Sequence, residues 1–243
     1  MTSQAPPQAV PAPPDKRRYV RDMFSAIAPR YDLLNRVLSL NVDRAWRRAA
    51  LERLEWRSRP QGRYLDACAG TLDLAALLGG SQGFLGTVCA TDFAVPMLRK
   101  GLAKSAGKPI GTAAADTLVL PFPDASFDGA TVGFGVRNLM DLDAGFREFV
   151  RVLKPGARLV MLDCSTPVNP VLRALYLTYF RRVLPVIGRV VSGHPTAYSY
   201  LPESVTDFPQ PAELEQRMAA AGLGRTGHQM LTGGIAALTW GVR

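Results

Sequence analysis

Short apolar runs alternate with helical segments over most of this chain. Strand-like runs lie at 63–67, 86–91, 109–115, 127–134 and 157–164. Segments with helical character separate them at 71–78, 95–103 and 141–153. This alternation predicts a mostly parallel sheet with helices on both faces. With a helix near 211–221 and two strand-like runs at 227–232 and 235–242, the sequence predicts a doubly wound, seven-stranded, Rossmann-like α/β fold.

The N-terminal part differs from this pattern. Residues 1–15 are rich in proline, and we expect a disordered tail there. A single domain is then predicted over 16–243. Within it, basic helices at 16–28, ended by Pro29, and at 43–56, capped by Asp43, are expected to form a helical cap over 16–60.

One later segment also interrupts the alternation. Residues 170–191 are strongly apolar and carry four arginines, and Pro185 divides them. We expect a helical insertion over 168–205 that covers the substrate. An interfacial helix that meets lipid is one interpretation of 170–191, and a helical cap on the core is the other.

The charge and the cysteines limit the class of protein. The net charge is +9 and the isoelectric point is near 9.9, which favours anionic partners without choosing among nucleic acid, acidic lipid and phosphates. Three cysteines without metal-ligand spacing indicate reduced thiols in a cytosolic protein and predict no metal site. We see no secretory signal and no uncharged run long enough to cross a membrane.

The turn LDACAGTLDLA, residues 65–75, lies between a predicted strand and a predicted helix. It contains one glycine, Gly70, and no lysine, so it matches neither a dinucleotide loop nor a phosphate loop. Acidic residues stand at the ends of three successive strands: Asp66, Asp92 and Asp116. In doubly wound sheets these ends meet at the ligand site, where a carboxylate can accept ribose hydroxyls and another can meet an adenine amino group. The pattern predicts nucleoside binding.

The charge of the turn selects among nucleosides. Asp66 and Asp73 disfavour a pyrophosphate and suit a cationic nucleoside such as S-adenosylmethionine, which carries a sulfonium and an ammonium. Two structural alternatives stay open at this stage. Asp73 can be an ordinary acid in the first turn of a helix, and Asp92 can be a helix cap.

Several longer motifs resemble one family. MFSAIAPRYDLLNRVLSLNVDRAWRR (23–48), LPFPDASFDGATVGFGVRNLMD (120–141), RVLKPGARLVMLDCSTP (151–167), YSYLPESVTDFP (198–209) and LTGGIAAL (231–238) occur in order. They resemble the ubiquinone/menaquinone C-methyltransferase family, a class I S-adenosylmethionine-dependent group.

The resemblance implies a set of contacts to the methyl donor. These are Thr71, Asp92, Asp116, Thr117 and Gly133, with Tyr31 from the segment that covers the site. Asp66 at the first strand end and Gly70 in the turn, from the strand-end pattern above, complete the candidate donor site. The chain departs from the family at Ala69 and Leu72, where glycine is usual. The side chain of Leu72 either takes up donor space or points under the following helix.

The resemblance also implies methyl transfer to a ring carbon of a polyprenyl quinol. Arg137, with Asn138, is expected to stabilise the phenolate or to order a water, unless it forms a structural ion pair with Asp141. Asp32 is a candidate proton acceptor or a helix cap, and Tyr198 is a candidate contact to the quinol.

We expect demethylmenaquinol as the acceptor, with the ubiquinone precursor as the alternative. An RNA methyltransferase and an inactive lipid-binding or scaffold protein are the competing functions. The leading hypothesis places the enzyme in the cytoplasm at the inner face of the membrane, contacting lipid through 170–191 and its basic helices. It has no nucleic-acid partner, and homodimerisation is open.

Overall fold

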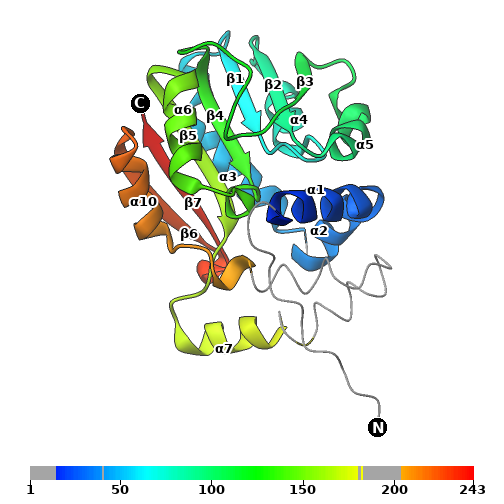
Figure 1. The fold of residues 1–243 in the computed structure, drawn as a ribbon, viewed down its shortest axis with the longest axis vertical. Coiled ribbons are helices and arrows are strands. Elements are labelled where there is room, and N and C mark those ends of the chain that lie inside the picture. The colour runs from blue at the N-terminus through cyan, green and yellow to red at the C-terminus, as the bar shows by residue number, and fades with distance from the viewer. Residues whose placement is uncertain (1–14, 40, 180–181, 183–203) are drawn as a thin grey trace.

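A computed structural model describes residues 15–39, 41–179, 182 and 204–243. Its centre is a seven-stranded sheet with the order β3-β2-β1-β4-β5-β7-β6 (Figure 1). The strands are β1 Arg63–Ala67, β2 Thr87–Asp92, β3 Ile110–Ala114, β4 Phe127–Gly133, β5 Leu153–Cys164, β6 Gly224–Leu231 and β7 Ala236–Val242. The helices of the main body are α3 Asp43–Leu54, α4 Asp73–Gly79, α5 Val95–Ser105, α6 Leu142–Val152 and α10 Pro211–Ala220.

The strand pairing confirms the predicted doubly wound fold. Strands β1 to β5 pair in parallel, and β7 is antiparallel to both β5 and β6. β1 and β4 are parallel neighbours, and the order of the strands along the sheet changes direction between them. β2 and β3 follow on one side of β1, and β5 follows on the other side, beyond β4. Ligands of doubly wound sheets bind beside such a reversal, at the carboxyl ends of the strands. The turn after β1 therefore stands at the expected place for a ligand site.

Two hydrophobic clusters hold the layers together. On one face, Tyr64 and neighbouring strand residues pack with side chains of α3, α4 and α5. On the other face, Leu65 and its neighbours pack with α6 and α10. Tyr64 and Leu65 are consecutive, and successive strand residues point to opposite faces. Continuous apolar strands are thus explained by burial on both sides.

The N-terminal helices cover the carboxyl ends of the strands. Helix α1 (Asp15–Ile27) ends before Pro29, as predicted, and a short 3-10 turn, Ala28–Arg30, joins it to α2 (Tyr31–Ser39). The prediction that Asp43 caps the next helix was wrong. Val42 is the N-cap of α3, and the Asp43 carboxylate instead contacts Ser39 and Arg47.

Strand β5 begins earlier than predicted. The sequence LKPG indicates a helix stop and a turn, and Gly156 does adopt a left-handed φ of 77°. Leu153 nevertheless already pairs with Phe127, and the register shifts before Gly129 pairs with Arg158. A strand irregularity absorbs the proline and the glycine, so the turn lies within the strand rather than before it.

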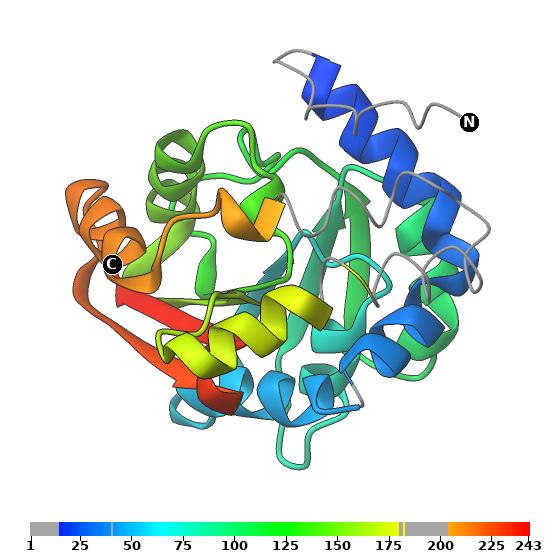
Figure 2. The same ribbon diagram turned by 90° about the horizontal axis from the view of Figure 1, so that it is seen from below.

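Helix α7 (Pro170–Thr178) begins the predicted insertion. It lies apart from the sheet, on the same side as α1 and α2, and Figure 2 shows these three helices together on that side. Most of the rest of the insertion, with Tyr198 and Pro185, lies outside the described residues. No helix in the described ranges is long and apolar enough to span a bilayer.

Candidate active site

The turn between β1 and α4 has an unusual backbone. Cys68, Gly70 and Leu72 adopt left-handed φ values of 50°, 53° and 66°. The Ala69 amide donates to the Thr91 carbonyl, and the Gly70 amide donates to the Asp92 carboxylate at 2.9 Å. These bonds attach the turn to the end of β2. The turn and the second strand end therefore form one unit.

The side chain of Leu72 points away from this unit. It is fully buried and belongs to the cluster of α4 and its neighbours. Gly101 on α5 provides the space, because a Cβ there would lie 2.6 Å from Leu72 Cγ. The leucine takes up core volume between α4 and α5 rather than room for a donor.

Asp66 and Asp92 are buried carboxylates at neighbouring strand ends. Asp66 accepts hydrogen bonds from the Ala75 amide and the Thr131 hydroxyl, both at 3.0 Å, and burial raises its pKa to about 7. Its two carboxylate oxygens thus bond separately to the first turn of α4 and to β4. Asp92 accepts from the amides of Gly70 and Ala94, and burial raises its pKa as well. Asp92 does not cap α5, because Ala94 is the N-cap.

Asp116 and Thr117 follow β3. Asp116 accepts from the Leu118 amide at 2.9 Å and forms an ion pair of 2.7 Å with Arg17 of α1. The buried Thr117 hydroxyl lies 3.3 Å from the Cys68 thiol, so it contacts the turn directly. The structure therefore gathers both residues at the same edge of the sheet as Asp92.

Helix α2 is attached to the turn by charged groups. The Thr71 hydroxyl donates to Asp32, and Lys104 of α5 contacts Asp32 at 2.7 Å and Asp73 at 2.6 Å. Burial alone would raise the pKa of Asp32, but the hydrogen bonds from Lys104 and Thr71 outweigh it, and its pKa is lowered. A carboxylate held in its charged form is a weak base, so this geometry favours Asp32 as a link between the helical cover and the turn.

Arg137 lies in the 3-10 helix Val136–Asn138, directly after β4. Its side chain is 7% exposed and forms an ion pair with Asp163 of β5. The alternative prediction of an ion pair with Asp141 was therefore wrong. Burial opposes its charge, but Asp163 outweighs this effect and raises its pKa. Asp141 instead caps α6 by accepting from the Ala144 amide. Asn138 is buried beside Arg137.

Tyr31 and Gly133 complete the set. Tyr31 starts α2, and burial raises its pKa, while the charges of Arg137 and Arg47 act in the opposite direction. Gly133 is the last residue of β4, and a Cβ there would lie 2.7 Å from Leu74 Cδ1. A larger side chain there would require the end of the Leu74 side chain to move. Tyr198 is outside the described residues.

Three charged residues at this site were not predicted: Arg47, Lys104 and Asp163. Arg47 and Lys104 lie on α3 and α5, and only the folded chain brings them to the turn. Asp163 had a sequence signal, because it stands one residue before the end of β5, as Asp66 stands one residue before the end of β1. The search for acidic residues at strand ends, which identified Asp66, Asp92 and Asp116, would have identified Asp163 if it had been extended to this strand.

The arrangement fits a cationic nucleoside. Strand-end carboxylates line up across β1, β2 and the segment after β3, and the turn offers no lysine of its own. The residues from 14 to 243 match the model of the ubiE/COQ5 methyltransferase family. The chain belongs to this family. It is an S-adenosylmethionine-dependent C-methyltransferase, and S-adenosylmethionine is its methyl donor.

Named relatives support the assignment. The demethylmenaquinone methyltransferase of Deinococcus radiodurans is 46% identical over 226 residues, which cover 92% of each chain. The ubiquinone/menaquinone biosynthesis C-methyltransferase UbiE of Geobacter sulfurreducens is 43% identical over 93% of this chain and 89% of its own. The crystal structure of a SAM-dependent methyltransferase from Aquifex aeolicus shares the fold, with a TM-score of 0.58 and 19% identity over 80% of this chain and 88% of its own.

Proposed function

We propose that this methyltransferase transfers a methyl group to a ring carbon of a polyprenyl quinol, with demethylmenaquinol as the acceptor. The Deinococcus relative is named for demethylmenaquinone, and so are relatives from Desulfitobacterium hafniense and Thermus thermophilus at 40% and 45% identity. The Geobacter relative is named for both quinones. The methoxy-polyprenyl-benzoquinol of ubiquinone synthesis is therefore the alternative acceptor.

The observation that carries this proposal is the state of Arg137. Its guanidinium is buried and charged, and Nη1 bonds to Asp163 and to the Phe134 carbonyl. Within the described residues, its buried Nε has no hydrogen-bond partner. A buried donor without a partner costs free energy, and an incoming anionic oxygen would remove that cost. A phenolate of the acceptor suits this position.

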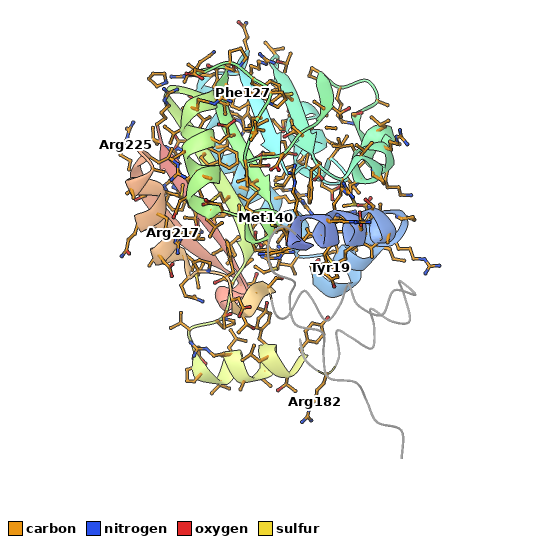
Figure 3. All side chains as sticks on the ribbon, in the orientation of Figure 1. Tyr19, Phe127, Met140, Arg182, Arg217 and Arg225 are labelled. Atoms are coloured by element: carbon orange, nitrogen blue, oxygen red, sulfur yellow. The ribbon has the colours of Figure 1, made fainter. Side chains whose placement is uncertain are left out.

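A cavity beside Arg137 offers room for the acceptor ring. Its volume is about 440 Å³. Its lining combines apolar side chains, Leu139, Met140, Leu142, Phe208 and Pro209, with Ser204 and the charged side chains of Lys16, Arg137, Asp141, Asp207 and Arg217. Figure 3 shows Met140 next to the N-terminal helix α1. A cavity lined by both apolar and charged side chains can take a ring that carries polar oxygens.

In the proposed reaction, the methyl donor and the enzyme side chains have separate roles. The donor supplies an electrophilic methyl group on its sulfonium. Arg137 stabilises the phenolate, and Asp163 holds the guanidinium in place. The ortho carbon of the phenolate would bond to the methyl group as the bond from that group to sulfur breaks, which leaves a neutral thioether, and the ring proton that the methyl group replaces would pass to a water. The helical cover, attached through Asp32, Thr71 and Lys104, orients the reactants and excludes water. Asn138 follows Arg137 in the 3-10 helix, and the charge of Arg137 acts on Tyr31.

Arg137→Ala tests this role. We expect turnover to fall about 100-fold or more, the loss typical when one preorganised donor is removed, while donor affinity stays within about threefold. Because Asp163 is left buried and unpaired, Arg137→Gln with Asp163→Asn serves as a second variant that removes the charge and keeps a polar pair. Near-normal turnover in a folded variant that binds the donor would exclude the role of Arg137.

We further propose that the enzyme acts at the cytoplasmic face of the membrane and contacts lipid through α7. Val168, Val171 and Leu175 are 70%, 69% and 65% exposed. Arg182 extends on the same side of the molecule (Figure 3). An apolar helix face next to basic residues favours the interface of an anionic membrane, where a polyprenyl quinol resides.

A further inference from the structure

We propose that Arg47 binds the carboxylate at the methionyl end of the methyl donor. S-adenosylmethionine carries a carboxylate as well as its two cationic groups, so its site needs a cation as well as carboxylates. None of the strand-end positions predicted from the sequence supplies one. The inference concerns the donor alone and does not depend on which acceptor the enzyme uses.

Helix α3 brings Arg47 to the end of β4. The guanidinium lies over the ring of Phe134, 5.2 Å from its centroid, and Phe134 directly follows Gly133. A Cβ built on Gly133 would lie 3.7 Å from Arg47 Nη1. Arg47 therefore reaches the point where the turn after β1 and the end of β4 meet. In doubly wound sheets this is the ligand side of the strand reversal.

The hydrogen bonding of Arg47 is incomplete. Its side chain is only 10% exposed, yet its two carboxylate contacts are long, at 3.3 Å to Asp43 and 3.4 Å to Asp73. Nη1 makes no hydrogen bond to the part of the chain that the structure describes. Guanidinium groups hold carboxylates through paired N–H donors at 2.7–2.9 Å. The Nη1 group of Arg47, which lies on the side that faces Gly133, is thus available to donate to a ligand.

The other two cations near the turn are more fully engaged. Lys104 contacts Asp32, Asp73 and Thr71 at 2.7, 2.6 and 3.1 Å. Arg137 donates from Nη1 to Asp163 and to the Phe134 carbonyl. Recruiting Lys104 would break short contacts that hold the site together, and the donor of Arg137 without a partner, Nε, is the one proposed above for the oxygen of the acceptor. Among these three cations, Arg47 is the one that can take up a carboxylate at the smallest cost.

Paired binding measurements test the assignment by calorimetry with S-adenosylmethionine and with decarboxylated S-adenosylmethionine. The second ligand keeps the sulfonium and the ammonium and lacks the carboxylate. We expect Arg47→Met to weaken binding of S-adenosylmethionine about 10- to 100-fold, the range for a hydrogen bond to a charged group. Binding of the decarboxylated ligand should change less than about threefold. The preference of the wild type for the carboxylate should therefore disappear.

Two further variants separate recognition from folding. Arg48→Ala removes an exposed arginine of the same helix and should leave both affinities unchanged. Arg47→Lys keeps the charge next to Asp43 and Asp73 but loses the planar fork, so it should weaken S-adenosylmethionine selectively. The proposal is overturned if both ligands lose affinity equally in the folded Arg47 variants, or if neither loses any. It is also overturned if the wild type does not distinguish the two ligands.

Discussion

Leu72 joins the donor turn to the hydrophobic core. Its φ of 66° is a conformation that favours glycine, while its side chain is fully buried. Leu72→Gly should relieve backbone strain of about 1 kcal/mol and lose a buried side chain worth about 2–5 kcal/mol, so thermal stability should fall. Donor affinity should change less than about threefold. Calorimetry measures the donor affinity, and thermal unfolding measures the stability. Leu78→Ala, a buried leucine of α4 in the same hydrophobic cluster, is the matched control. A tenfold tighter donor in Leu72→Gly would show that the leucine takes up donor space.

Gly101 is the residue that makes room for Leu72. A Cβ there would approach the Thr71 backbone and Leu72 Cγ to 2.6 Å, and backbone atoms cannot give way easily. Gly101→Ala should therefore destabilise the protein by about 1–3 kcal/mol and weaken donor binding, because it displaces the turn. Gly111→Ala is the control, since nothing lies within 4 Å of the new methyl group. Equal stability of the two variants in chemical denaturation would contradict this account of the turn.

Asp66 should make stability depend on pH. Its pKa is about 7 in the fold, above the value of about 3.9 in an unfolded chain. Between these values the folded protein holds a proton that the unfolded chain releases, so this residue's contribution to stability is lost as pH rises from about 4 to 7. Asp66→Asn should therefore reduce the difference in unfolding free energy between pH 5 and pH 8. The same difference in the variant and the wild type would show that Asp66 is charged throughout.

The sequence predicted the correct donor from the negative charge of Asp66 and Asp73, but it treated both carboxylates as free charges. Asp73 does not offer free negative charge, because Lys104 and Arg47 contact its carboxylate. It is an acid in the first turn of α4, which was one of the structural alternatives. Burial also makes Asp66 easier to protonate. Strand-end position could be predicted from the pattern, whereas the neutralising partners come from helices whose packing the pattern does not encode.

At the scale of elements, apolar runs predicted the strands well. The predicted 63–67 and the observed Arg63–Ala67 coincide, and β2, β3 and β4 differ from their predictions by about one residue at either end. The prediction failed where local rules conflict with tertiary pairing. Pro155 and Gly156 indicate a turn, but pairing of Leu153 with Phe127 already places this segment in β5. Asp43 has the sequence of a helix cap, but its carboxylate is drawn to Arg47.

Helix α7 should bind vesicles through its apolar face. Val171→Asp with Leu175→Asp should reduce co-sedimentation with anionic vesicles at least about tenfold, because charge replaces buried apolar area at the interface. Leu85→Asp with Val119→Asp changes two equally exposed apolar residues outside α7 and should not affect binding. Vesicle binding that survives the α7 substitutions would exclude this helix as the membrane contact.

In the whole molecule, the sheet and the helical cover meet at one edge. The turn after β1 is connected to α2 by Asp32 and Lys104, to α3 by Arg47, and Asp116 is connected to α1 by Arg17. Helix α7, on which Val171 and Leu175 are exposed, lies on this side as well (Figure 2). The proposed donor site, the proposed acceptor cavity and the proposed membrane contact thus belong to one face. Such an arrangement lets a substrate with a long apolar tail stay in the bilayer while its ring enters the protein.

The central claim is methyl transfer to a quinol ring, and a reconstituted reaction tests it most directly. Purified enzyme is mixed with methyl-labelled S-adenosylmethionine and anionic vesicles that contain demethylmenaquinol, and a parallel reaction contains the methoxy-polyprenyl-benzoquinol. Mass spectrometry of the extracted quinones should find one labelled methyl on a ring carbon of the demethylmenaquinol product, and Arg137→Ala should lower its rate of formation about 100-fold or more. Donor binding without label on a ring carbon of either quinone would contradict the account.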